Sequence, residues 1–199
     1  EKLKKQIEVA VNAFKDQRIL EAEELTKKLI IENPKVAFLY NLLGLILIQQ
    51  QKFEQAFESY NKGIEVDPNF AMIYNNLGLL YDHKKKDSLK AEEYYKKAIS
   101  LDKKLPEPYN NLASIYKSSD KFDKAIDCYN KAIEINPKFV VGYHNLGTIH
   151  ISLGNFDEAR KNFVKAIEID PNYSISHRTL SRLIKYTETN EHLIQLNKI

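Results

Sequence analysis

One eight-residue pattern, repeated at an almost constant interval, constrains this chain more than any other feature. It reads Tyr-Asn-Asn-Leu-Gly-Leu-Leu-Tyr at residues 74–81 and returns, with substitutions, at residues 40–47, 109–116 and 143–150. Its fifth residue is Gly44, Gly78, Ala113 or Gly147, so the copies are 34, 35 and 34 residues apart. A fixed period of this length predicts a repeat protein in which similar units stack on their neighbours.

A second pattern follows each copy of the first. An alanine is followed four residues later by an aromatic residue, and three residues after that by a small residue. The alanine is Ala56, Ala91, Ala125 or Ala159, the aromatic is Tyr60, Tyr95, Tyr129 or Phe163, and the small residue is Gly63, Ala98, Ala132 or Ala166. These spacings place the residues on one helical face, and a proline closes three of the copies because it ends a helix. Each period is therefore predicted to contain two helices.

The two patterns together resemble the tetratricopeptide repeat family. The family has an aromatic at position 4 of its repeat, Leu-Gly at 7 and 8, Tyr at 11, Ala at 20 and 27, an aromatic at 24 and Pro at 32. The resemblance covers nearly the whole chain and implies an all-α solenoid, a right-handed superhelix of antiparallel helix pairs. Small residues at positions 8, 20 and 27 let neighbouring helices approach closely, while the large residues fill the space between them.

The repeats are expected at fixed boundaries within a domain of residues 1–189. They cover residues 3–36, 37–70, 71–105, 106–139 and 140–173, followed by a capping helix at 174–187 and a short extra helix, or the start of a following segment, at 190–199. The third repeat is one residue longer than its neighbours, and the extra residue lies within 82–88. An insertion in a surface turn costs little, so we expect such a turn there with a solvated charge run at residues 84–86; the alternative is a basic contact site at the same residues.

Composition argues against several functional classes. The 30 basic and 27 acidic residues are nearly balanced, which gives no nucleic-acid-binding charge, and the longest apolar stretch, residues 36–48, is too short to span a bilayer. The one cysteine, Cys128, and the lack of a signal peptide favour the cytoplasm. No glycine-rich phosphate loop, metal-ligand spacing or nucleophile–base pattern is present, so we expect no catalytic residue, no cofactor and no metal. The ends of the sequence suggest a fragment of a longer polypeptide.

The resemblance places a peptide-binding groove on the first helix of each repeat, at positions 2, 5, 6, 9, 12 and 13. The candidate groove residues are Phe38, Asn41, Leu42, Leu45, Met72, Asn75, Asn76, Leu79, Asn110, Asn111, Lys117, His144 and Asn145, with Arg178 and Arg182 on the capping helix. Asn76, Asn111 and Asn145 recur at position 6 and resemble the asparagine ladder of O-linked N-acetylglucosamine transferases, which would bind a peptide backbone. Alternatively, the asparagines at positions 5 and 6 bridge neighbouring helices.

The candidate groove is apolar at its second repeat and polar towards the C-terminus. The helix at 36–50 is apolar almost all round, which predicts burial on more than one side. A ligand, the first repeat or a second copy of the chain would each cover it. The lysines and arginine of the family's carboxylate clamp are absent, so any preference for acidic peptides would come from Arg178, Arg182 and Lys185.

These features predict a non-catalytic scaffold that binds a protein or peptide in the groove. Two alternatives stay open. Residues 177–193 resemble the junction after the repeats in bacterial tetratricopeptide–sulfotransferase fusions, which would make the chain the recognition module of a larger sulfotransferase- or glycosyltransferase-type enzyme. The apolar second repeat would instead suit a self-assembling oligomer.

Overall fold

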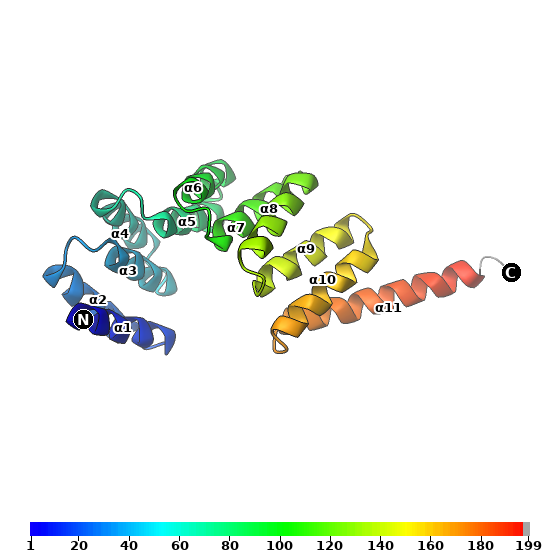
Figure 1. Ribbon diagram of the computed structural model, residues 1–199, viewed down its shortest axis with the longest axis horizontal. Helices are drawn as coiled ribbons and strands as arrows, with labels where there is room; N and C mark the ends of the chain where they lie inside the picture. The colour runs from blue at the N-terminus through cyan, green and yellow to red at the C-terminus, as the bar shows by residue number, and fades with distance from the viewer. Residues whose placement is uncertain (197–199) are drawn as a thin grey trace. The chain divides into compact units, whose positions relative to one another are not determined.

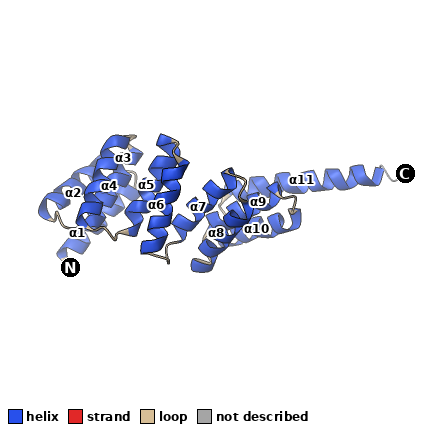
Figure 2. Cartoon of the chain, turned by 90° about the horizontal axis from the view of Figure 1, so that it is seen from above, coloured by secondary structure: helices blue, strands red, loops and turns tan. Residues whose placement is uncertain are grey.

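The computed structural model describes residues 1–196, and every regular element in that range is a helix (Figures 1 and 2). The α-helices are α1 (Lys2–Lys15), α2 (Ile19–Glu32), α3 (Ala37–Gln49), α4 (Phe53–Val66), α5 (Ala71–Leu80), α6 (Ser88–Leu101), α7 (Pro106–Ser118), α8 (Phe122–Ile135), α9 (Val140–Ser152), α10 (Phe156–Ile169) and α11 (Ser174–Leu196); a π-helix, η1 (Tyr81–Lys85), follows α5. The chain divides into two compact units, Glu1–Lys103 and Lys104–Ile199, here the N-terminal and C-terminal units.

Consecutive helices pair in an antiparallel arrangement. On α3 and α4, Gly44 lies against Tyr60, while Tyr40, one turn earlier on α3, lies against Gly63, one turn later on α4. The contact pairs therefore run in opposite directions along the two helices. The pairs α3–α4, α7–α8 and α9–α10 coincide with copies of the two sequence patterns, and α5–α6 differs only by the inserted π-helix. The pair α1–α2 occupies the region of the expected first repeat.

Glycine next to a buried ring sets the distance between paired helices. A methyl group added at Gly44 would overlap Cε1 of Tyr60, and one added at Gly78 would lie 2.5 Å from Cε1 of Tyr95. Both rings are buried and leave no space for that atom. The expectation that small residues admit the aromatic ones is confirmed, with Ala113 in place of glycine in the α7–α8 pair.

The first helix of each ordinary pair ends in a Schellman motif. Gln17, Gln51, Asp120 and Gly154 all have a left-handed backbone with φ between 55° and 74°. After each of them, the next N–H bonds to the carbonyl five residues earlier, as from Lys52 to Leu47 at 2.9 Å. These turns satisfy the last carbonyls of the helix and reverse the chain.

The third repeat departs from this geometry because of its extra residue. The left-handed residue is Lys86, with φ of 51°, and the N–H of Asp87 bonds to the carbonyl of Tyr81, six residues earlier, at 3.1 Å. The last turn of the helix widens to the π-helix η1, which takes up the insertion. The structure agrees with an insertion absorbed in a surface turn, and it adds that this turn is a widened helical one whose backbone stays hydrogen-bonded.

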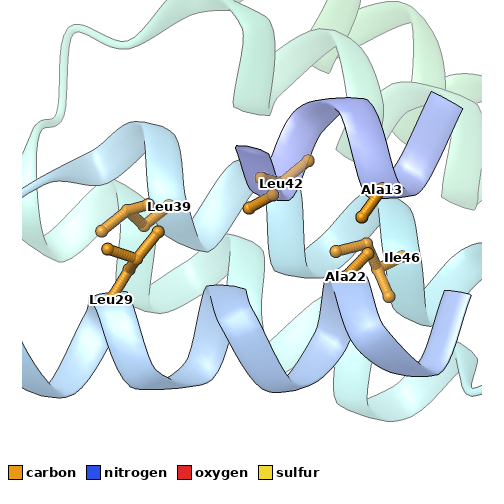
Figure 3. Close-up of a cluster of buried hydrophobic side chains, with 7 residues drawn as sticks. Ala13, Ala22, Leu29, Leu39, Leu42 and Ile46 are labelled. Atoms are coloured by element: carbon orange, nitrogen blue, oxygen red, sulfur yellow. The ribbon is translucent and has the colours of Figure 1, made fainter. Parts of the chain in front are cut away.

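The first repeat covers much of the apolar second repeat (Figure 3). Ala13 and Ala22, on α1 and α2, pack with Leu39, Leu42 and Ile46 of α3 in one buried cluster. Leu42 is only 3% exposed, so its assignment to the ligand groove is wrong. A ligand, the first repeat and a second copy of the chain were the three candidates for covering this face, and the first repeat covers it at Leu42.

The C-terminal helix is longer than expected. α11 runs unbroken from Ser174 to Leu196, whereas the sequence suggested a cap ending at residue 187 and a new helix from 190. No proline or glycine lies in that interval to end it. Leu180 and Leu183 of α11 pack on Phe163 of α10, which is the contact expected of a cap. The last three residues of the predicted extra helix, 197–199, lie outside the described residues. In the described part of the chain, no helix has the length and apolar character needed to cross a bilayer.

Candidate functional site

The predicted groove positions fall into three groups by exposure. We call the face formed by these positions on the first helix of each pair the inner surface. Asn41, Leu42, Asn75 and Asn110 are buried; Phe38, Leu45, Asn76, Leu79, Asn111, Lys117, His144 and Asn145 are half-buried; Met72, Arg178 and Arg182 are exposed. Phe38 packs against the buried cluster of the first two repeats. The half-buried and exposed groups supply the accessible part of the inner surface.

Asparagine pairs join neighbouring first helices in both units. In the N-terminal unit, Nδ2 of Asn76 donates to Oδ1 of Asn41 at 2.8 Å, from α5 to α3. In the C-terminal unit, Nδ2 of Asn145 donates to Oδ1 of Asn110 at 2.9 Å, from α9 to α7. Asn41 is only 1% exposed, so its side chain belongs to the helix interface. These contacts favour the bridging interpretation at Asn76 and Asn145, although each amide keeps a second N–H for another acceptor.

A hollow of about 600 Å³ lies on the inner surface of the N-terminal unit. Its lining residues are Leu45 and Ile48 of α3, Tyr60 of α4, Asn76, Leu79 and Leu80 of α5, and His83 and Lys84 of η1. Three predicted groove residues, Leu45, Asn76 and Leu79, therefore come together, while the predicted Met72 is not among the lining residues.

Three lining residues, Tyr60, Leu80 and Lys84, lie outside the predicted groove positions. Tyr60 was assigned to the core, where it is buried, and it also lines the hollow. Lys84 was assigned to a solvated charge run, but η1 places its ammonium 4.1 Å from the centre of the Phe53 ring. The extra residue before Ser88 was the sequence feature that could have indicated the unusual position of Lys84.

The inner surface of the C-terminal unit is polar. Nζ of Lys117 on α7 donates to Oγ1 of Thr148 on α9 at 2.9 Å, and Oγ1 of Thr148 donates to the carbonyl of Asn145 at 2.7 Å. Burial lowers the pKa of Lys117 because the charged form loses hydration. The lysine is therefore a partly dehydrated cation held by a neutral hydroxyl.

His144 lies beside this lysine in an aromatic environment. Its Nδ1 is 3.0 Å from Oγ of Ser176 on α11, and its ring centre lies 5.4 Å from that of Phe163 and 5.7 Å from that of Tyr173. Burial, and secondly the charge of Lys117, lower the pKa of His144. The neutral imidazole is therefore favoured, and it links α9 to the capping helix.

The exposed arginines of α11 complete the polar surface. Arg182 lines a second hollow, of about 410 Å³, with Ile151, Phe156, Thr179 and Leu183. Arg178 lies one turn earlier on the same helix and is exposed. The sequence thus predicted both arginines as surface cations, and the structure adds the apolar hollow beside one of them.

The local environment of Cys128, the one cysteine of the chain, lowers the reactivity of its thiol. Burial, and then the neighbouring carboxylate of Asp127, raise the pKa of Cys128, which keeps it protonated and weakly nucleophilic. Within the described residues, no three His, Cys, Asp or Glu side chains gather closely enough to hold a metal ion.

Comparison with protein families identifies the repeats. The tetratricopeptide repeat family matches residues 106–139, 140–173 and 71–105, and a TPR repeat family matches residues 44–84, so the matches together cover more than half of the 199 residues. This chain belongs to the tetratricopeptide repeat family. Protein–protein interaction is typical of that family.

Solved structures agree on the fold. MamA is 27% identical with a TM-score of 0.63, and the match covers 83% of this chain and 96% of that one. The Cut9–Hcn1 complex of the APC/C is 17% identical with a TM-score of 0.82; the match covers 93% of this chain but spans only 37% of that one. YrrB, described as a TPR protein with an unusual peptide-binding site, is 17% identical with a TM-score of 0.59, covering 87% and 89% of the two chains. No curated protein matches the chain.

Proposed function

We propose that this chain is a non-catalytic interaction module whose N-terminal unit binds a segment of a partner protein on its inner surface. The observation that supports this proposal is the hollow of about 600 Å³ lined by Leu45, Ile48 and Leu79. Apolar walls of this kind favour a bulky apolar side chain, since burying one contributes about 1.5–3 kcal/mol. The partner would therefore anchor itself through a leucine-sized or aromatic residue.

Asn76 gives the same hollow a means of holding a peptide backbone. Its bond to Asn41 uses one of two N–H groups, and its side chain is half-buried at the hollow. The second N–H suits a main-chain carbonyl of the partner, which gives affinity independent of sequence. The ladder and bridge interpretations are thus compatible at this residue: one N–H joins the helices and the other faces the ligand.

Similarity to a described peptide-binding repeat protein, YrrB, is consistent with this function but is at the level of fold. The alternative proposal is that the repeats are the recognition module of a longer sulfotransferase- or glycosyltransferase-type enzyme, which the proposed binding would serve in the same way. An immunoblot of the source cell separates the two cases. A band near 23.1 kDa means a separate scaffold, and a band tens of kilodaltons larger means a fused domain.

The test is selection of ligands followed by a matched pair of leucine substitutions. A phage library of random dodecapeptides is selected on the full chain, and the enriched peptides are measured by fluorescence anisotropy. Leu79→Ser removes an apolar wall of the hollow, whereas Leu89→Ser makes the same change at a side chain that is 78% exposed on α6.

We expect enriched peptides to share a large apolar residue and to bind Leu79→Ser about tenfold or more weakly, because that variant loses most of one buried side-chain contact. Leu89→Ser should bind as the parent does. Equal affinity for both variants, or enrichment of peptides without an apolar residue, would contradict the proposal.

A further inference from the structure

We propose that the inner surface of the C-terminal unit holds an anion site, in which Lys117 receives the side-chain carboxylate of an acidic partner segment. The inference rests on the proposed function, because it specifies the chemistry of a partner that binds the inner surface. It concerns a different unit from the apolar hollow and has its own assay.

The first step is the pairing of Lys117. Its ammonium has three N–H donors, and one bonds to the neutral hydroxyl of Thr148 at 2.9 Å. Among the residues whose side chains the structure describes, no carboxylate lies within salt-bridge distance of Lys117. Many other lysines of the chain, by contrast, pair with an acidic residue on their own helix: Lys27 with Glu23, Lys96 with Glu92, Lys131 with Glu134, Lys161 with Glu158 and Lys165 with Glu168.

The second step is the cost of leaving this cation half-buried. Removing an ammonium from water is unfavourable unless an opposite charge compensates it. The lowered pKa of Lys117 reflects that loss of hydration, with no attractive charge offsetting it. An incoming carboxylate would supply the missing charge and accept the two remaining N–H bonds.

The third step is the balance of charges at the inner-surface positions of the C-terminal unit. Arg178 and Arg182 are exposed at inner-surface positions of α11. At the same positions of α7, of α9 and of α11 up to residue 185, the one acidic residue is Glu107, at position 2 of α7. Cations therefore outnumber carboxylates on this face. His144, which also faces Lys117, is held towards its neutral form, so the lysine is the cation at this point of the surface.

The assay uses labelled hexaglutamate and hexaglutamine as probes. Each peptide is titrated with the full chain at low and at physiological salt, and binding is read by fluorescence anisotropy. The variants are Lys117→Gln, Lys117→Arg and Lys131→Gln. The last is a matched control, because it removes the same charge from an exposed lysine on α8. Circular dichroism confirms that each variant is folded.

We expect hexaglutamate to bind the parent more tightly than hexaglutamine does, and Lys117→Gln to weaken hexaglutamate binding about tenfold or more, as for loss of a charge-assisted hydrogen bond. Lys117→Arg should keep most of the affinity, and Lys131→Gln should change it less than twofold. Equal binding of the two peptides, or equal losses in Lys117→Gln and Lys131→Gln, would overturn the site.

Two further arms separate related explanations. If inorganic phosphate displaces hexaglutamate at much lower concentration than acetate does, the site is a phosphate site and the carboxylate assignment is overturned; comparable displacement supports it. Leu79→Ser should leave hexaglutamate binding intact. The anion site is therefore tested independently of the apolar hollow of the N-terminal unit.

Discussion

Replacing Asn76 by alanine should destabilise the fold even in the absence of any ligand. The amide of Asn76 donates at 2.8 Å to Oδ1 of Asn41, whose side chain is 1% exposed. Alanine removes the donor and leaves that oxygen buried with one bond fewer. A buried polar group deprived of its partner costs about 1–3 kcal/mol, and we expect the free energy of unfolding to fall by that amount.

Urea denaturation followed by circular dichroism measures the effect. Asn130→Ala is the control, because Asn130 is an exposed asparagine on α8 and its replacement should change stability by less than about 0.5 kcal/mol. Replacing Asn41 and Asn76 together by leucine should cost less than the two single replacements combined, since neither partner is then left unpaired.

A different result would refute the bridging interpretation. If Asn76→Ala matches the parent within about 0.5 kcal/mol, as a surface substitution does, the amide does not stabilise the helix interface. The asparagines would then be retained for ligand binding alone. If the predicted loss is found, alanine substitution at residues 76 and 145 lowers stability as well as binding, and any binding measurement must be corrected for the unfolded fraction.

Three further predictions follow from the packing, the turns and the titration of the C-terminal unit. Gly44→Ala should lower the free energy of unfolding by about 1–3 kcal/mol through overpacking against Tyr60, less about 1 kcal/mol of improved helix propensity. A raised urea midpoint would contradict the ring contact. Lys86→Gly should raise the free energy of unfolding by about 0.5–1 kcal/mol because the left-handed backbone at residue 86 suits glycine, and a lower urea midpoint would contradict that conformation. Folding lowers the pKa of His144, so the contribution of its neutral form to stability is present above about pH 6.5 and is lost as pH falls through the lowered folded value. The urea midpoint should therefore drop less between about pH 7.5 and pH 5 in His144→Gln than in the parent protein. Identical drops would refute this linkage.

The sequence predicted the helix pairs well because their determinants are local. Helical spacing of small and aromatic residues fixes which faces meet, and Gly44 beside Tyr60 is a direct consequence. The same spacing could not decide whether Leu42 faces a ligand or another repeat, since both environments demand an apolar residue. The side chains of α1 and α2 settle that question, and they lie in the repeat with the weakest pattern.

Two other features depended on geometry that a sequence pattern does not contain. The repeat pattern shows an asparagine at position 6 but does not show whether its side chain faces solvent or a neighbouring helix. For Asn76, the 2.8 Å distance to Asn41 decides between these two environments. The insertion near Ser88 was recognised from the repeat length, but its conformation was not. A loop and a widened helical turn have the same length, and the choice depends on which carbonyl the N–H of Asp87 reaches.

That widened turn has a consequence for how the chain can change in length. Because η1 absorbs the additional residue before α6 begins, Tyr95 still reaches Gly78 as Tyr60 reaches Gly44. The pairing of α5 with α6 is therefore unaffected by the insertion. This junction is a position where residues, or a short tag, can be inserted without moving the faces that stack, whereas the same insertion inside α5 would rotate each later side chain by about 100° around the helix axis.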